Sequence, residues 1–410
     1  MNFLKPRVEQ IKLFFRAFSI LLALFLVATN AIADEFDTVN FMASSTYVRD
    51  SNLFRLPAHA QPSAPGAERA DNIYRNSVGI SINKPYSLQV FKFDYAYVDT
   101  KYDNADFLDF KASNYKAAWE WALTPSLTGV LSKDRIVSLV PFQDLRSTTA
   151  SQTKNVRTKE TQIFSFDFSP HNTLHFIGGY NKLDVKNSKT FLPETSFKLD
   201  TINAGIKYVF PSASYISFVS SVSDGQNQEI NFTQQVGKGF KQKQQSLSML
   251  WLATGKSRVG AELGYLDVVD DTFSTRDFSG IYGNVNYIWD ITGKTTLSMG
   301  LARKLSSFQT SFDTYTVSDT LFFSPIWHAT SKITVRANTQ FGHRDFKGEG
   351  PLVSTVDRKD NVFSYGVGVD WAPRSVVQFG LNLQHDEINS NFKNVESSDN
   401  TISLNGKLMF

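Results

Sequence analysis

The chain has 410 residues, no cysteine and a formal net charge of +3 at pH 7. The absence of cysteine excludes thiol catalysis, thiolate metal sites and a lipoprotein anchor. The positive excess comes from the first 16 residues. The charge of the remaining chain therefore gives no reason to expect nucleic acid or an acidic partner.

The N-terminal segment has the pattern of a secretory signal. Four basic residues precede an apolar run over 17–27 that only Ser19 interrupts, and Ala31-Ile32-Ala33 supplies the small residues of a cleavage site. The run is shorter than the roughly 20 residues that a membrane-spanning helix needs, although an uncleaved inner-membrane anchor is the alternative. We expect residues 1–33 to be a cleaved signal peptide and residues 34–410 to form a single β-barrel domain.

Alternating segments follow along the rest of the chain. In 91–97, 115–121, 363–371 and 377–383, every second residue is apolar or aromatic, and the residues between are mostly polar, small or charged. Successive side chains of a strand point to opposite faces, so each segment predicts a strand with one apolar and one polar face. Repetition of this pattern over segments of about 10 residues is typical of strands in a transmembrane barrel.

Clusters of turn-forming residues recur about every 40 residues and join these segments in pairs. The clusters are 83–85, 124–126, 169–172, 211–214, 254–257, 292–294, 330–332 and 372–375. Longer polar stretches separate the pairs: 50–71, 141–154, 186–193, 223–238, 270–277, 306–313, 342–359 and 386–400. Short turns on one side and long loops on the other predict an all-β outer-membrane barrel of about 18 antiparallel strands, with periplasmic turns and extracellular loops. A β-propeller has a similar repeat length, but it does not explain rows of aromatic residues opposite rows of polar ones.

The last ten residues predict one more strand, in which Ile402, Leu404, Gly406, Leu408 and Phe410 share a face. A strand that ends in an aromatic residue resembles the assembly signal of Gram-negative outer-membrane barrels. The resemblance implies that the barrel assembly machinery is a partner and that Phe410 is the signal.

One segment carries a family resemblance. Residues 47–57 read Tyr-Val-Arg-Asp-Ser-Asn-Leu-Phe-Arg-Leu-Pro. Further matches lie at 107–110, 114–115, Trp119, 124–125, 134–135 and 155–158. This pattern resembles the EpsL family, outer-membrane proteins of exopolysaccharide operons associated with an exosortase. The matches are dense only in the first third of the chain. The resemblance implies a polysaccharide-associated barrel and assigns no catalytic residue.

The polar faces supply the candidate site. If the barrel closes, they surround a lumen, and the alternation predicts that twelve charged residues line it. These are Arg75, Lys92, Asp94, Lys116, Glu120, Asp167, Lys207, Arg258, Glu262, Arg336, Asp370 and Lys407. With no dominant sign, this set predicts at most a weak preference for anions and a neutral or sparsely charged polymer, because rings of one sign set ion selectivity. A generic wet lumen is the alternative.

The sequence favours neither an enzyme nor a metal or cofactor site. His171 and His175 are four residues apart, but a turn followed by a strand does not bring them to one face. Asp267, Asp270, Asp271 and Asp277 could hold a divalent cation with lipopolysaccharide, although a solvated loop is the better interpretation. We therefore expect no catalytic residue, cofactor or resident metal.

The sequence thus predicts a channel or scaffold in the Gram-negative outer membrane that supports exopolysaccharide biosynthesis and export. Its expected partners are outer-membrane lipids and lipopolysaccharide, the polymer itself and export components of the periplasm or inner membrane. A general or solute-specific porin is the alternative, and a barrel hydrolase is a third.

Overall fold

The computed structural model describes residues 38–64, 66–142, 152–189, 195–230, 236–307, 313–349 and 356–410. The expected signal peptide and its cleavage position lie outside these residues. Within the described ranges, no helix is long and apolar enough to cross a membrane.

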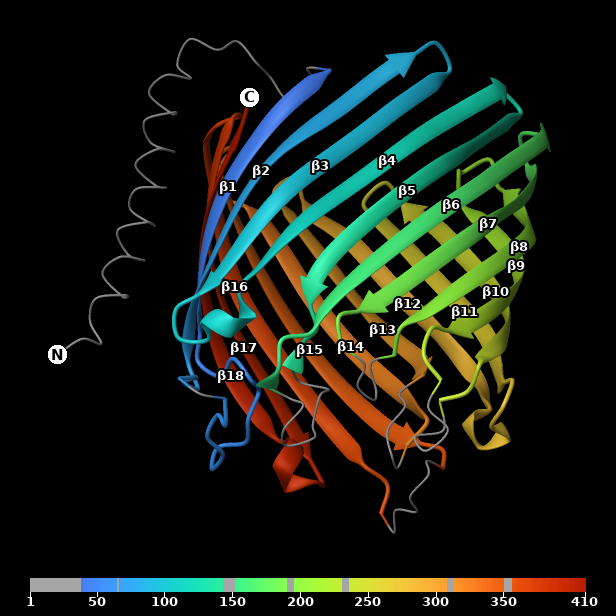
Figure 1. Ribbon diagram of the computed structural model, residues 1–410. Helices are drawn as coiled ribbons and strands as arrows, with labels where there is room; N and C mark the ends of the chain where they lie inside the picture. Colours follow the sequence, from blue (N-terminus) through green and yellow to red (C-terminus); the bar gives the residue numbers. More distant parts are fainter. Residues whose placement is uncertain are drawn as a thin grey trace.

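Eighteen antiparallel strands form one sheet that closes on itself through the pairing of β1 with β18 (Figure 1). The strands are β1 (Val39–Asp50), β2 (Asp71–Tyr86), β3 (Gln89–Tyr102), β4 (Phe110–Thr124), β5 (Leu127–Leu139), β6 (Val156–His171), β7 (Leu174–Asn187), β8 (Phe197–Val209), β9 (Tyr215–Asn227), β10 (Gly239–Thr254), β11 (Ser257–Asp270), β12 (Phe278–Thr292), β13 (Thr295–Ser307), β14 (Tyr315–His328), β15 (Ile333–Lys347), β16 (Lys359–Arg374), β17 (Val377–Ser390) and β18 (Ser397–Met409). Each strand pairs with its sequence neighbours, so the barrel is a simple up-and-down meander. The predicted fold class and strand number are confirmed.

The short connections lie at one end of the barrel and the longer ones at the other, and the last residue lies at the end with the short turns (Figure 1). Seven of the eight predicted turn clusters overlap the observed turns. The cluster at 83–85 does not, because β2 continues to Tyr86 and the chain reverses at Ser87, whose φ is +55°. Proline lacks a backbone N–H, but Pro85 lies at the end of its strand, where this loss interrupts little of the ladder.

A ninth long connection, 103–109, was not predicted. It contains the 3-10 helix η2 (Asp106–Leu108) and is held by Asp71, whose fully buried carboxylate accepts backbone N–H groups from Asn72, Asp103, Asn104 and Ala105 at 2.7–3.1 Å. The connection is too short and too compact to stand out as a polar stretch.

The main apolar core lies at the mouth with the long loops, not along the barrel axis. Leu53 and Phe54 of the 51–70 loop pack with Tyr102, Leu108 and Phe142, and Phe54 is only 2% exposed. The 51–70 loop, which contains residues 51–57 of the segment with the family resemblance, is therefore folded onto the barrel.

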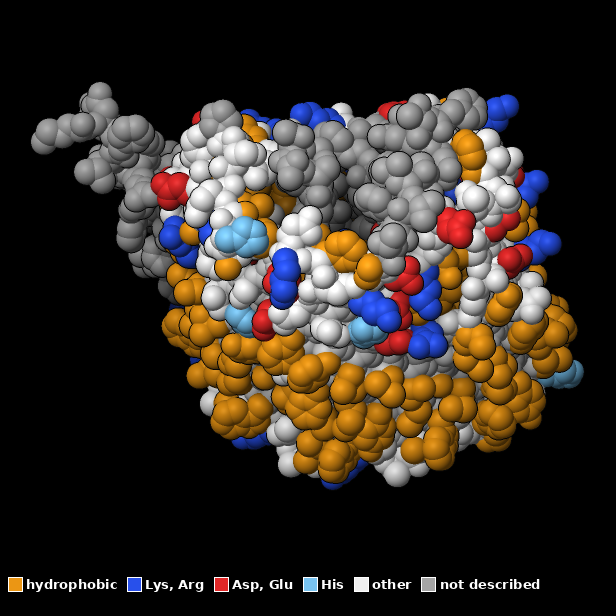
Figure 2. Space-filling model, turned by 90° about the horizontal axis from the view of Figure 1, so that it is seen from below, with side chains coloured by type: hydrophobic (Ala, Val, Ile, Leu, Met, Phe, Trp, Pro, Cys, Tyr) orange, Lys and Arg blue, Asp and Glu red, His pale blue; other side chains and the backbone are white. Residues whose placement is uncertain are grey.

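The outer surface carries the apolar rows. Val285, Leu301, Leu321, Phe341 and Phe363 are consecutive cross-strand partners on β12 to β16. Figure 2 shows that hydrophobic side chains gather in a broad band on the outer wall, with charged and histidine side chains beside it. Such a band is the lipid-facing surface of a transmembrane barrel.

Candidate functional site: the inner wall of the barrel

The inner wall is the face opposite the apolar rows, and the strand register places the twelve charged residues there. They are Arg75 on β2, Lys92 and Asp94 on β3, Lys116 and Glu120 on β4, Asp167 on β6, Lys207 on β8, Arg258 and Glu262 on β11, Arg336 on β15, Asp370 on β16 and Lys407 on β18. The period of two and the register decide this, because alternate residues of a strand share a face and register partners on neighbouring strands share that face too.

Asp167 is the centre of a three-residue charge cluster near the turn end of the barrel. Its carboxylate contacts Nζ of Lys207 at 2.5 Å and Nδ1 of His175 at 2.6 Å. The three residues come from β6, β7 and β8 and lie in adjacent register positions. The sequence did not identify His175 as a member of this cluster, because the contacts join three strands.

Two further ion pairs lie at similar depth. Lys92 bonds Glu120 across β3 and β4, and Arg336 contacts Asp370 at 2.6 Å across β15 and β16. In each pair, neighbouring strands contribute opposite charges. The electrostatic fields of the two charges therefore largely cancel in the lumen beside them.

Other members of the set have different surroundings. Asp94 accepts a hydrogen bond from Ser81 at 2.6 Å, and Glu262 accepts one from Asn284 at 3.1 Å. Lys116 is the register partner of Asp94 on one side and of Asp134 on the other. Arg75, Arg258 and Lys407 form no ion pair with another described residue.

The structure adds inner charges that the sequence did not single out. On the acidic side are Asp50, Asp71, Asp134, Asp270, Asp290, Asp360, Asp386 and Asp399; on the basic side are Arg157, Lys159, Lys304 and Arg344. Since most of the additions are acidic, they offset the small basic excess of the predicted set. Between the charges, small and amide-bearing residues fill the wall, including Ser77, Ser165, Asn203, Gln244, Asn286, Ser298, Asn338, Gln384 and Ser403.

Side-chain contacts fix the 51–70 loop at the mouth of the barrel. Arg55, whose φ of +55° is unusual for a side chain of its size, bonds Asp50 at 2.9 Å and Asp399 at 3.1 Å. Asn52 is 1% exposed and donates to the carbonyls of Leu56 and Ser398 at 2.8 and 3.0 Å. The segment that carries the family resemblance is thus bonded to the first strand, β1, and to the last strand, β18.

Beside this loop, a cavity of about 400 Å³ opens on the inner side of β2 to β5. Arg55, Arg75, Asn114, Tyr102 and Phe142 are among the residues that line it. It combines guanidinium, amide and aromatic groups at the entrance of the lumen.

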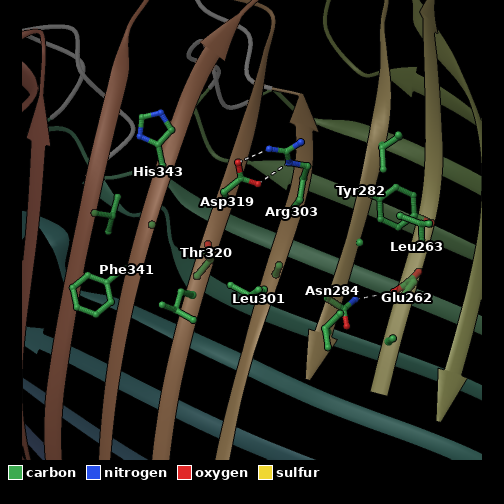
Figure 3. Close-up of a pocket in the computed structure, with 18 of the residues that line it drawn as sticks. Glu262, Leu263, Tyr282, Asn284, Leu301, Arg303, Asp319, Thr320, Phe341 and His343 are labelled. Atoms are coloured by element: carbon green, nitrogen blue, oxygen red, sulfur yellow. Dashed lines mark hydrogen bonds and ion pairs between the residues drawn. The ribbon is translucent and has the colours of Figure 1, made fainter. Parts of the chain in front are cut away.

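A groove of about 1080 Å³ lies instead on the outer wall, over β9 to β17 (Figure 3). Leu263, Leu301 and Phe341 line its apolar part, and the ion pair of Arg303 with Asp319, at 2.7 Å, lies toward the loops. Its apolar lining belongs to the lipid-facing band, so the groove lies outside the lumen.

Asp270, Asp277 and His175 each hold other protein groups in the structure. Asp277 accepts the backbone N–H of Asp270 at 2.7 Å, and Asp270 accepts those of Thr272 and Phe273, so these carboxylates hold the 271–277 loop. His171 ends β6, whereas His175 bonds Asp167 on the inner wall. The described residues contain no cluster of three His, Asp or Glu side chains that could hold a metal ion.

Comparisons with known proteins agree with this architecture. Residues 250–410 match the profile of a family described as "Putative beta-barrel porin 2". Among solved structures, OpdQ of Pseudomonas aeruginosa is similar with a TM-score of 0.53 and 11% sequence identity, over 91% of this chain and 98% of that chain. OccK1 (OpdK) of the same organism has a TM-score of 0.51 and 11% identity, over 92% of this chain and 100% of that chain. A BenF-like porin from Pseudomonas fluorescens Pf-5 has a TM-score of 0.50 and 11% identity, over 92% of this chain and 99% of that chain. None of the curated proteins compared matches.

The closed barrel and these likenesses define the class of protein. The chain is a closed 18-stranded barrel with the porin fold, and its residues 250–410 are similar to a porin family.

Proposed function

We propose that the chain is a porin-type channel for weakly charged, hydroxyl-rich solutes, and that saccharides are its substrate class. The observation that carries the proposal is the pairing of the inner charges. Asp167 lies between Lys207 and His175, and Arg336 contacts Asp370, so neither sign dominates the wall. A lumen without a ring of one sign has little to select ions with.

The side chains between the pairs suit saccharides. Serine and threonine hydroxyls and asparagine and glutamine amides both donate and accept hydrogen bonds, as sugar hydroxyls do. A solute that exchanges such bonds with the wall at many weak sites can enter and also leave, which is the requirement for conduction.

Proteoliposome swelling tests this proposal. We expect glucose to enter at least as fast as gluconate and glucosamine, which are of comparable size, and an empty liposome to show none of these fluxes. Entry of gluconate many times faster than glucose would instead indicate a dedicated anion channel and would reject the proposal.

Export of an exopolysaccharide is the second candidate. The folded 51–70 loop favours it, because the Tyr47–Pro57 segment that resembles the EpsL family is a built part of the mouth. Under this proposal the polymer is neutral or sparsely charged, and lipopolysaccharide and export components of the cell envelope are partners. Deletion of the gene should then lower secreted polysaccharide and leave sugar uptake unchanged. Normal polysaccharide with slower sugar uptake would contradict export and support the general porin.

A further inference from the structure

Three aromatic side chains of the inner wall lie directly opposite a glycine on the neighbouring strand. The pairs are Phe240 with Gly225, Tyr282 with Gly264 and Phe322 with Gly300. In each pair, the ring occupies the space of the missing side chain. A Cβ built on Gly300 would lie 2.8 Å from Cε1 of Phe322, and Cβ atoms on the other two glycines would lie closer still to the opposite ring.

A ring in this position lies along the wall instead of projecting across the lumen. Figure 3 shows Tyr282 beside β11, the strand that carries Gly264. All three rings are half-buried, as expected when one face is against the backbone and the other faces the lumen.

The rings descend into the barrel. Phe240 is the second residue of β10, Tyr282 the fifth of β12 and Phe322 the eighth of β14, and all three strands begin at the mouth. Counted from the first residue of its strand, each ring lies three residues farther from the mouth than the one before it. At the mouth, Phe197 of β8 stands edge-on to Phe240, with ring centroids 6.2 Å apart.

Polar groups accompany the rings. Gln244 of β10 donates to the Tyr282 hydroxyl at 2.5 Å. Asn284 of β12 bonds Glu262 of β11 at the next inward-facing register pair after Tyr282 and Gly264. Asn286 is the register partner of Gly300, and Gln340 is that of Phe322, so two amides flank the deepest ring.

This combination matches the surface of a pyranose. The axial C–H bonds of the sugar ring carry partial positive charge, which meets the negative face of an aromatic ring, while the equatorial hydroxyls point sideways toward hydrogen-bonding groups. We propose that Phe240, Tyr282 and Phe322 form an aromatic track on which the pyranose rings of one saccharide chain stack as it passes through the lumen. The proposal rests on the channel function proposed above and names the recognition element within it.

The outer face supplies a matched control. Phe166 lies against Gly178 in the same cross-strand arrangement, but on the lipid-facing side. Replacing Phe166 by leucine removes an aromatic ring from a glycine without touching the lumen.

Single-channel recording in planar bilayers tests the track, with maltohexaose as the probe and polyethylene glycol of matching length as the steric control. Stacking on an aromatic ring depends on the C–H face that pyranoses share and not on one particular sugar. Maltohexaose is therefore a suitable probe for the track. We expect maltohexaose to interrupt the wild-type current for longer than the glycol does. Phe240→Leu, Tyr282→Leu and Phe322→Leu should each shorten the interruption roughly threefold to tenfold.

Tyr282→Phe and Phe166→Leu should keep the wild-type interruption time, since the first keeps the inner ring and the second changes only the outer face. Heat-modifiable migration in gels shows whether each variant folds, and Tyr282→Phe separates a lost ring from a lost hydroxyl. Leucine variants that fold and retain the wild-type time would overturn the track, as would a wild-type channel that maltohexaose interrupts no longer than the glycol.

Failure of the channel function gives a different result. If neither the wild type nor any variant conducts, saturation-transfer NMR in micelles still shows whether a saccharide binds to the aromatic track. Contact of maltohexaose C–H groups with wild-type aromatic protons, lost in the triple leucine variant, supports it. Absence of contact in the wild type overturns it.

Discussion

At the scale of single residues, half of the twelve predicted inner charges contact a residue of opposite charge. Asp167 contacts both Lys207 and His175, and its side chain is 27% exposed. Water in the lumen screens such a pair, so its contribution to stability is small, whereas its effect on the local potential acts directly on a passing ion.

Asp167→Asn should therefore change selectivity more than stability. The substitution leaves Lys207 without a carboxylate partner, so the reversal potential in a salt gradient should move toward anion preference. The free energy of unfolding should fall by about 1 kcal/mol or less. Asp200→Asn removes a carboxylate from the outer face of β8 and should leave the reversal potential unchanged. An unaltered potential in Asp167→Asn would place this cluster away from the ion path.

Two glycines of β11 give a second prediction at this scale. A Cβ on Gly264 would overlap the Tyr282 ring, whereas one on Gly260 would meet nothing within 4 Å. We expect Gly264→Ala to lower the free energy of unfolding by about 1–3 kcal/mol, because the ring must leave the wall and its bond to Gln244. Gly260→Ala should be neutral or stabilising by about 0.5–1 kcal/mol, since glycine is entropically costly within a strand. Urea unfolding in micelles, followed by tryptophan fluorescence, measures both; equal effects would contradict the packing argument.

At the scale of elements, the mouth is organised by loops that hold one another. Gln152 accepts bonds from Ser63 and Ala64 of the 51–70 loop, and Lys154 bonds the carbonyl of Asp109. Phe54 lies between Phe107 and Phe142, with ring centroids 6.4 and 5.0 Å away. Three loops distant in sequence thus form one packed unit on one side of the entrance.

Asp71 ties this unit to the barrel, so Asp71→Asn should loosen it. An amide cannot accept four backbone N–H groups as a carboxylate does, and buried donors left without a partner cost about 1–3 kcal/mol. Protease added to intact cells should cut the 51–70 or 103–109 loop faster in this variant, while the barrel stays folded. Asp106→Asn changes an exposed acid of the same connection and should behave as wild type. Equal cleavage of Asp71→Asn and wild type would show that other contacts hold the loops.

At the scale of the whole molecule, the barrel depends on the seam between its first and last strands. Phe41 and Phe410 exchange backbone hydrogen bonds of 2.5 and 2.9 Å, and their rings stack with centroids 6.2 Å apart. Closure leaves no free edge in the sheet, and a sheet in lipid requires this because every backbone group must be bonded.

Phe410→Ala should weaken the seam. Loss of the ring pair should lower stability by about 1 kcal/mol, and the temperature at which the folded band disappears from gels should fall. We also propose Phe410 as a recognition element for assembly, so less folded barrel should reach the outer membrane. Phe218→Ala, an outward-facing substitution on β9, serves as the control. Normal amounts of barrel with a lower melting temperature would limit Phe410 to its structural role.

The sequence by itself determined the fold class, the strand number and the two faces of each strand. These depend on a period of two that is local to each segment, so Lys92 and Asp94 are separated from Phe91 and Phe93 by neighbouring positions alone. Turn residues fixed most boundaries for the same local reason. They failed at 83–85, where a proline at a strand end looks like a turn.

The tertiary structure alone decided which residues meet. The contact of Asp167 with Lys207, the placement of Tyr282 over Gly264 and the clamp of Arg55 on Asp399 each join different strands or loops. Such contacts depend on the register between strands and on the stagger with which the barrel closes. Pattern within a segment does not encode either quantity, because a shift between two strands leaves the sequence of each unchanged.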